Sequence, residues 1–271
     1  MIDFDVLLRS AHARHADYAS ASPFPHTVWD NFLPEEVAEA VSAEFPANTG
    51  DAWNHYHHYN EKKLAIKSLA QMGPSTRAVF EALQSDEFRG VIRALSGMDD
   101  LISDPDLDGA GLHMIRRGGF LNIHADFQSH TKNRHWSRQL NLLWYLNKDW
   151  QEEWNGNLEL WNEDMTTRIH SILPAFNRCV IFSTQGKTFH GHPNPLACPE
   201  HNARRSLALY YFRDEEDECA LTPTNYQPRP QDSGVKRILI AMDRQLVRGY
   251  SFLKRYTSLN DGLIDRILKR F

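Results

Sequence analysis

A series of short segments between residues 112 and 212 constrains the fold of this 271-residue chain more than any other feature. The segments are rich in β-branched and aromatic residues, and turn-forming sequences such as Gly118-Gly119 and Asn155-Gly156-Asn157 separate them. Many short strands without intervening helices are typical of an antiparallel sandwich or barrel. The segments are LHMIRR (112–117), FLNIHADF (120–127), RQLNLLWYLN (138–147), NLELW (157–161), RCVIFS (178–183) and RRSLALYYF (204–212).

Helical patterns flank this β-rich region on both sides. Residues 33–45 and 74–95 have apolar residues at helical spacing, and residues 235–256 and 259–271 show the same pattern. Residues 53–63, WNHYHHYNEKK, have no clear period and are predicted to form a loop. We therefore expect a mainly β core with flanking helices. The predicted organisation is a single domain over 1–271, with helical support over 1–100, the β core over 101–215 and C-terminal helices over 230–271.

Composition excludes several classes of function. The formal net charge of −5 argues against a nucleic-acid partner, because phosphate binding usually needs a basic excess. No apolar run approaches the roughly 20 residues of a membrane span, and the N-terminal residues lack the apolar core of a secretory signal. Three cysteines suggest neither a disulfide framework nor a paired-cysteine metal site. We expect a cytoplasmic protein without a membrane or nucleic-acid partner.

Two strong metal ligands, His124 and Asp126, lie in the predicted strand FLNIHADF. Residues i and i+2 of a strand point to the same face, about 7 Å apart along the backbone, so both side chains can reach one ion. A third ligand is expected from KTFHGHPNP (187–195), where His190 is the favoured candidate and His192 the alternative. Two histidines and one carboxylate on a β scaffold are the ligands of non-haem Fe(II) oxygenases.

An arginine pair, Arg204-Arg205, opens the last apolar strand and is followed by Ser206. The planar guanidinium group can bind a carboxylate in bidentate fashion, and a nearby hydroxyl can add a hydrogen bond. Arg204 and Ser206 share one face of the strand, whereas Arg205 points to the other. We therefore favour Arg204 as the anion-binding residue, with Arg205 as the second choice.

The HxD pair, the distal histidine and the Arg-x-Ser strand, in this order, resemble the Fe(II)- and 2-oxoglutarate-dependent oxygenases, particularly the prolyl-4-hydroxylase-like branch. The resemblance covers roughly residues 110–213. It implies a double-stranded β-helix, or jelly roll, and an enzyme that uses Fe(2+), 2-oxoglutarate and O2. It also implies that His124, Asp126 and His190 hold the metal, which favours His190 over His192.

By the same resemblance, Arg204 binds the distal carboxylate of 2-oxoglutarate. Related enzymes often have a tyrosine shortly before the HxD motif that also contacts the cosubstrate, but this chain has Ile115-Arg116-Arg117 there. Asn141 and Tyr145, on one face of the segment 138–147, are the predicted replacements.

The implied reaction is hydroxylation of an unactivated C–H, with release of succinate and CO2. The presence of Asp126 favours hydroxylation, because related halogenases have a small residue at that position. The expected substrate is a small metabolite, an amino acid or a natural-product intermediate. Residues 53–63 and 128–136, with Arg134 and Trp136, are candidates for a lid. The alternatives are a cupin-like metalloprotein that does not use 2-oxoglutarate and a hydroxylase of peptides.

Overall fold

The computed structural model describes residues 2–46, 50 and 52–256. The helix predicted over 259–271 therefore lies outside the described residues. Within the described part of the chain, no helix combines the length and the apolar character needed to cross a membrane.

The centre of the molecule is a sheet of 13 strands. Its hydrogen-bonded order is β1-β10-β7-β12-β5-β3-β6-β11-β8-β9, with β13 paired to β6, β2 to β3 and β4 to β12. The strands are β1 (His26–Trp29), β2 (Asn54–His58), β3 (Glu61–Ile66), β4 (Leu101–Ser103), β5 (Gly111–Arg116), β6 (Phe120–Ala125), β7 (Trp136–Tyr145), β8 (Leu158–Trp161), β9 (Arg168–Ile172), β10 (Arg178–Ser183), β11 (His190–His192), β12 (Ala203–Asp214) and β13 (Asn225–Tyr226).

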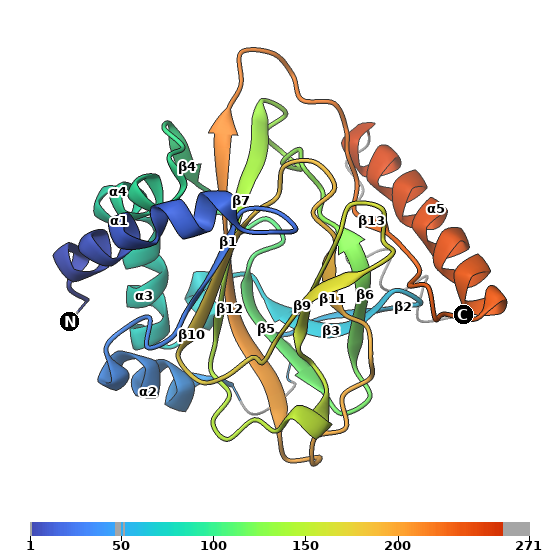
Figure 1. Ribbon diagram of the computed structural model, residues 1–271, viewed down its shortest axis with the longest axis horizontal. Coiled ribbons are helices and arrows are strands. Elements are labelled where there is room, and N and C mark those ends of the chain that lie inside the picture. Colours follow the sequence, from blue (N-terminus) through green and yellow to red (C-terminus); the bar gives the residue numbers. More distant parts are fainter. Residues whose placement is uncertain (1, 47–49, 51, 257–271) are drawn as a thin grey trace.

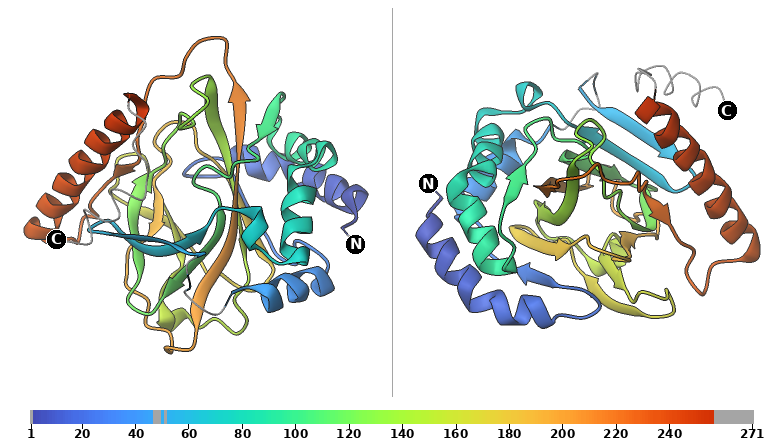
Figure 2. Two further views of the ribbon diagram at one scale, coloured as in Figure 1. Left: turned by 180° about the vertical axis from the view of Figure 1, so that it is seen from behind. Right: turned by 90° about the horizontal axis from the view of Figure 1, so that it is seen from above.

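All of the pairings in this sheet are antiparallel, and the sheet curls around a central interior, as the view from above shows (Figure 2). Helices cover the sheet on two opposite sides, with α1 to α4 on one side and α5 on the other (Figure 1). This is the predicted jelly roll with flanking helices. The helices are α1 (Phe4–Ser20), α2 (Glu35–Glu44), α3 (Pro74–Gln84), α4 (Asp86–Ser96) and α5 (Gly234–Tyr256), with short 3-10 turns η1 (Leu69–Gln71) and η2 (Glu152–Trp154).

Alternation along β7 explains how the sheet separates two cores. Leu142 and Trp144 pack with buried residues of α3 and α4 in the larger core between the sheet and the helices. Tyr145 faces the other way and packs with Leu160 and Phe182 inside the curled sheet. Apolar residues occupy consecutive positions from Leu142 to Tyr145, because this part of β7 is covered on both faces.

The helical segment predicted over 74–95 is two helices. Ser85 ends α3 in an extended conformation, and its hydroxyl oxygen accepts a hydrogen bond from the Phe88 backbone N–H at 3.2 Å, so it also caps α4. Asp86 and Glu87 in the first turn of α4 favour the new start electrostatically. The predicted end at Ser96-Gly97 is confirmed, since Gly97 has φ +71 and its N–H donates to the carbonyl of Arg93.

The prediction of a loop over 53–63 is wrong, because this segment forms most of the β2–β3 hairpin. The hydrophobic periodicity of this segment is weak because β3 changes neighbours, pairing with β6 near its start and with β5 near its end. Charged residues of the hairpin, such as Glu61 and Lys63, also pair with each other. The first hundred residues thus supply three strands, β1 to β3, in addition to helices. The helix predicted over 235–256 is confirmed as α5.

Candidate active site

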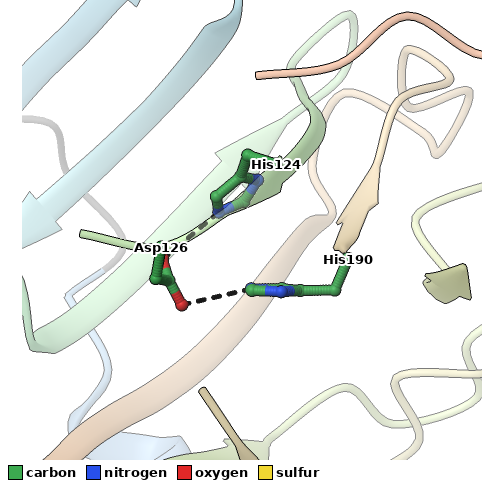
Figure 3. Close-up of side chains that lie close together, drawn as sticks. All are labelled: His124, Asp126 and His190. Atoms are coloured by element: carbon green, nitrogen blue, oxygen red, sulfur yellow. Dashed lines mark ion pairs between the residues drawn. The ribbon is translucent and has the colours of Figure 1, made fainter. Parts of the chain in front are cut away.

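Three side chains that can bind a metal come together on β6 and β11. In the described part of the chain, His124, Asp126 and His190 form one group whose potential ligand atoms all lie within 4.8 Å of one another. The Nε2 atoms of both histidines are 3.4 Å from the Asp126 carboxylate, one from each oxygen. Figure 3 shows the three side chains pointing toward one another. All three are well buried.

Backbone carbonyls orient both imidazole rings. Nδ1 of His124 lies 2.9 Å from the carbonyl oxygen of Asn122, and Nδ1 of His190 lies 2.9 Å from that of Thr188. In each case the partner two residues earlier fixes Nδ1 as the N–H donor, so that the Nε2 lone pair faces the centre of the group. This is the arrangement that a divalent metal requires of two histidine ligands.

The close approach of β11 to β6 depends on Gly191. His190 lies opposite His124, and the pairing is irregular between His190 and His192. A Cβ atom on Gly191 would lie 2.8 Å from the carbonyl oxygen of Asn122, so only glycine allows this approach. Glycine within the His-Gly-His sequence thereby brings His190 to the HxD pair.

The acid of the group is held in its ionised form. Burial alone raises the pKa of Asp126, but the charge of Arg138, together with the contacts to His190 and His124, outweighs it and holds the pKa well below its usual value. Oδ2 of Asp126 lies 3.1 Å from Nη2 of Arg138 and accepts a hydrogen bond of 2.7 Å from Nδ2 of Asn141. Burial lowers the pKa of His190 to about 4 despite the nearby Asp126, so its ring is neutral at neutral pH.

These donors fit a divalent transition metal. One hard carboxylate and two imidazoles on the same side of a rigid sheet can bind Fe(II) and leave coordination positions free for other molecules. The buried anion has its compensating cation, Arg138, beside it, so the site keeps its carboxylate charged when no metal is bound.

Arg138 and Asn141 form a chain of contacts behind the carboxylate. Nε of Arg138 donates to Oδ1 of Asn141 at 2.7 Å, and Asn141 in turn donates to Asp126. The guanidinium carbon lies 3.3 Å from the ring centroid of Tyr210 and 4.7 Å from that of Phe127. Asn141, predicted to contact the cosubstrate, is hydrogen-bonded to the Asp126 carboxylate. Sequence reasoning did not identify Arg138.

A second polar group lies deeper in the interior around Arg204. This residue is buried, its Nε donates to the carbonyl of Gly156 at 2.7 Å, and its Nη2 donates to the hydroxyl of Tyr145 at 3.1 Å. Gly156 has φ +85, and a Cβ there would lie 3.1 Å from Cδ of Arg204. No carboxylate among residues 2–46, 50 and 52–256 forms an ion pair with Arg204. A buried guanidinium without an acid partner fits a site for an anionic molecule.

The structure separates the two candidate arginines. Arg204 and the buried Ser206 face the interior, and Ser206 lies opposite Tyr145 on β7. Arg205 faces the other side of the sheet, where its guanidinium carbon lies 5.5 Å from the ring centroid of Phe45 near α2. The predicted partners Arg204, Ser206 and Tyr145 are therefore together, and Arg205 is apart from them.

His192, the alternative ligand in the sequence, is not part of the metal-binding group. Its ring is buried, and neither ring nitrogen has a hydrogen-bond partner. Burial, together with the charge of Arg204, lowers the pKa of His192 well below its usual value. The ring is therefore neutral, and it lies near both Arg204 and His124.

The predicted lid residues have other neighbours. Trp136 packs against His130 and Phe212, and Arg134 pairs with Glu218 at 3.5 Å. In the β2–β3 hairpin, the ring centroid of His58 lies 6.0 Å from that of Tyr226. Tyr226 borders the metal-binding group, since its ring centroid lies 5.4 Å from that of His124.

Comparison with known proteins shows a family resemblance. Residues 110–213 match the sequence model of the 2OG-Fe(II) oxygenase superfamily. The matched segment contains His124, Asp126 and His190, so this part of the chain is similar to that superfamily. The similarity supports a 2-oxoglutarate-dependent dioxygenase, an enzyme class that uses Fe(II), 2-oxoglutarate and O2. It favours this class over the cupin-like alternative without 2-oxoglutarate. No match was found among curated proteins.

Three solved structures with a similar fold are prolyl hydroxylases. A prolyl-4-hydroxylase from Pseudomonas putida is 19% identical, with a TM-score of 0.54 over 75% of this chain and 98% of that chain. A prolyl hydroxylase from Trichoplax adhaerens, in complex with a peptide of hypoxia-inducible factor, is 16% identical with a TM-score of 0.55 over 77% and 91%. A prolyl 4-hydroxylase from Phytophthora capsici is 19% identical with a TM-score of 0.54 over 93% and 76%. These similarities support the jelly-roll fold of this oxygenase.

Proposed function

We propose that this oxygenase hydroxylates an unactivated C–H of a small metabolite, an amino acid or a natural-product intermediate, with release of succinate and CO2. The observation that carries the proposal is the group of His124, Asp126 and His190, whose ligand atoms lie within 4.8 Å of one another in a buried interior. In this proposal the three side chains hold Fe(II). The bound metal, with 2-oxoglutarate and O2, supplies the oxidation that replaces C–H by C–OH.

Arg204 binds the distal carboxylate of 2-oxoglutarate in this proposal. Its burial, its lack of an acid partner among the described residues and its fixed orientation on the Gly156 carbonyl support this role. The hydroxyl of Tyr145, 3.1 Å from Nη2 of Arg204, and the hydroxyl of Ser206 on the same face add hydrogen-bonding groups. Arg204, Tyr145 and Ser206 would bind and orient the cosubstrate.

Asp126 favours hydroxylation over halogenation. Its carboxylate occupies the ligand position that a halide would need, and Arg138 and Asn141 hold it in place. Both contacts reach the same oxygen, Oδ2. Asp126 is therefore a fixed, ionised ligand.

The surroundings of the metal-binding group support a small substrate. Aromatic rings lie near it on two sides, Tyr226 beside His124 and the pair Tyr210 and Phe127 around Arg138. These rings contribute apolar surface around the group, which suits a small substrate. A peptide substrate is the alternative, since some of the solved structures with a similar fold are prolyl hydroxylases.

The test is succinate release under a matched pair of substitutions. Purified enzyme with Fe(II), 2-oxoglutarate and O2 would be screened against free amino acids, small natural products and proline-containing peptides. Arg204→Ala should raise the KM for 2-oxoglutarate by at least about tenfold, because it removes a charge-assisted contact. Arg205→Ala, at the adjacent position on the opposite face, should leave this KM within about twofold.

Two outcomes would contradict the proposal. Equal effects of Arg204→Ala and Arg205→Ala would refute the role of Arg204. Substrate-dependent succinate release with peptides but not with small molecules would refute the proposed substrate class and favour the peptide alternative.

A further inference from the structure

We infer that His192 is a second binding residue for the distal carboxylate of the cosubstrate, donating a hydrogen bond beside Arg204. The inference rests on the proposed function, since it requires 2-oxoglutarate to lie between the metal-binding group and Arg204. It assigns a role to a histidine that is two residues from a proposed metal ligand but does not itself face the metal.

The surroundings of His192 place its ring in the interior. His192 lies opposite Leu121 of β6, after an irregularity in the strand pairing that follows His190. The residue is buried, and both Arg204 and His124 act electrostatically on its ring. His192 therefore lies near both the metal-binding group and Arg204.

Arg204 is fixed by two hydrogen bonds. Its Nε donates to the carbonyl of Gly156, and its Nη2 donates to the hydroxyl of Tyr145. Because Arg204 acts electrostatically on the His192 ring, His192, Tyr145 and Arg204 border one region of the interior.

The state of the His192 ring indicates that a ligand is its partner. The residue is 3% exposed, and both Nδ1 and Nε2 are buried without a hydrogen-bond partner. Buried polar groups in native proteins are almost always hydrogen-bonded, and leaving one without a partner is costly. By contrast, the ring nitrogens of the proposed ligands His124 and His190 each have an assignment, Nδ1 to a backbone carbonyl and Nε2 to the metal.

A carboxylate is the partner that fits. A carboxylate can accept about four hydrogen bonds, and Arg204 already uses its Nε and one Nη2 proton on Gly156 and Tyr145. Its remaining N–H groups can contact the anion on one side, which leaves lone pairs for a neutral imidazole N–H. His192 would therefore add affinity for a keto acid that carries a distal carboxylate, and none for one that lacks it.

The experiment compares two keto acids that chelate metal in the same way. 2-Oxoglutarate carries the distal carboxylate, whereas 2-oxopentanoate has the same chain length and ends in a methyl group. Each would be titrated anaerobically into the Fe(II)-loaded protein, and the dissociation constant read from the visible charge-transfer band of the chelated keto acid. Fe(II) affinity would be measured separately, and the variants are His192→Leu and His192→Gln.

His192→Leu should raise the dissociation constant of 2-oxoglutarate by about 10- to 100-fold, as expected for a lost hydrogen bond to a charged group. It should change that of 2-oxopentanoate and of Fe(II) by less than about twofold. His192→Gln, which keeps an N–H donor, should recover part of the lost 2-oxoglutarate affinity. Because leucine needs no buried partner, His192→Leu should also fold at least as stably as the unsubstituted protein without ligand.

Two results would overturn the inference: an unchanged dissociation constant for 2-oxoglutarate in His192→Leu, or equal weakening of both keto acids. The second result would assign His192 to the metal-chelating end. Failure of the proposed function looks different, since the unsubstituted protein would then bind Fe(II) but give no band with either keto acid.

Discussion

The contact between the β2–β3 hairpin and α5 should make stability fall as pH rises through the weakly alkaline range. His58 connects the two elements, with Nδ1 2.8 Å from Asp243 on α5 and Nε2 3.0 Å from Glu61 on β3. Burial lowers the pKa of His58, but hydrogen bonds to the two carboxylates outweigh it and raise the pKa from 6.5 to about 9. The charged imidazole therefore stabilises the folded state.

The direction and size of the effect follow from this pKa. Because the folded-state pKa is the higher one, the stabilisation is fully present below pH 6.5 and is lost as pH rises toward 9. Each pH unit within that range removes about 1.4 kcal/mol, so the loss has an upper bound of about 3 kcal/mol. The His58 side chain is 20% exposed, which limits the screening by solvent.

The assay is urea unfolding at several pH values between 6 and 9.5, followed by tryptophan fluorescence. The free energy of unfolding of the unsubstituted protein should exceed that of His58→Gln most at pH 6, and the difference should shrink as pH rises to 9. Asp243→Asn should reduce this pH dependence. His57→Gln, at the adjacent exposed position, controls for the loss of a histidine from the hairpin. A difference between the unsubstituted protein and His58→Gln that is constant over the whole range would refute the reasoning.

Two further predictions concern the metal-binding group. Gly191→Ala should lower the free energy of unfolding, measured in urea, by about 1–3 kcal/mol, because the added Cβ would lie 2.8 Å from a backbone carbonyl oxygen of β6. The control is Gly186→Ala. Gly186 has φ +79 but open space around its Cβ position, so this variant measures the cost of a positive φ without a close contact. Equal losses in both variants would contradict the close approach. Asn141→Ala should weaken Co(II) binding by about 10- to 100-fold, because Asp126 loses an orienting hydrogen bond, while circular dichroism stays unchanged. An unchanged Co(II) dissociation constant would contradict this role.

The features that follow strict strand alternation were predictable from the sequence. His124 and Asp126 share a face because they are two residues apart, and the same rule separates Arg204 from Arg205. The strands β5, β6, β7, β8, β10 and β12 were recognisable for the same reason, since each combines β-branched or aromatic residues with flanking turn signals.

Contacts between distant strands could not be read in this way. Asn141 was predicted to contact the cosubstrate because it shares a face with Tyr145. The structure shows that its amide donates a hydrogen bond to Asp126 at the end of β6, and the sequence does not indicate that these two positions lie close together. Arg138 is buried because the Asp126 carboxylate and the rings of Tyr210 and Phe127 surround its guanidinium group. The sequence around Arg138 does not indicate any of these contacts.

The β2–β3 hairpin shows the same limit for secondary structure. Its residues have weak strand periodicity, and its strands are held by pairing with β5 and β6 and by charges such as Lys63 and Glu61, 2.9 Å apart. The break between α3 and α4 did have a local signal, since Ser85 followed by two acids is a typical helix start.

The most direct test of the central claim is anaerobic addition of Fe(II) and 2-oxoglutarate to the metal-free protein. The visible charge-transfer band of the chelated keto acid should appear in the unsubstituted protein, be lost in His124→Ala and be weakened in Arg204→Ala. A protein that binds Fe(II) by an independent measurement but gives no band with saturating 2-oxoglutarate would contradict the account.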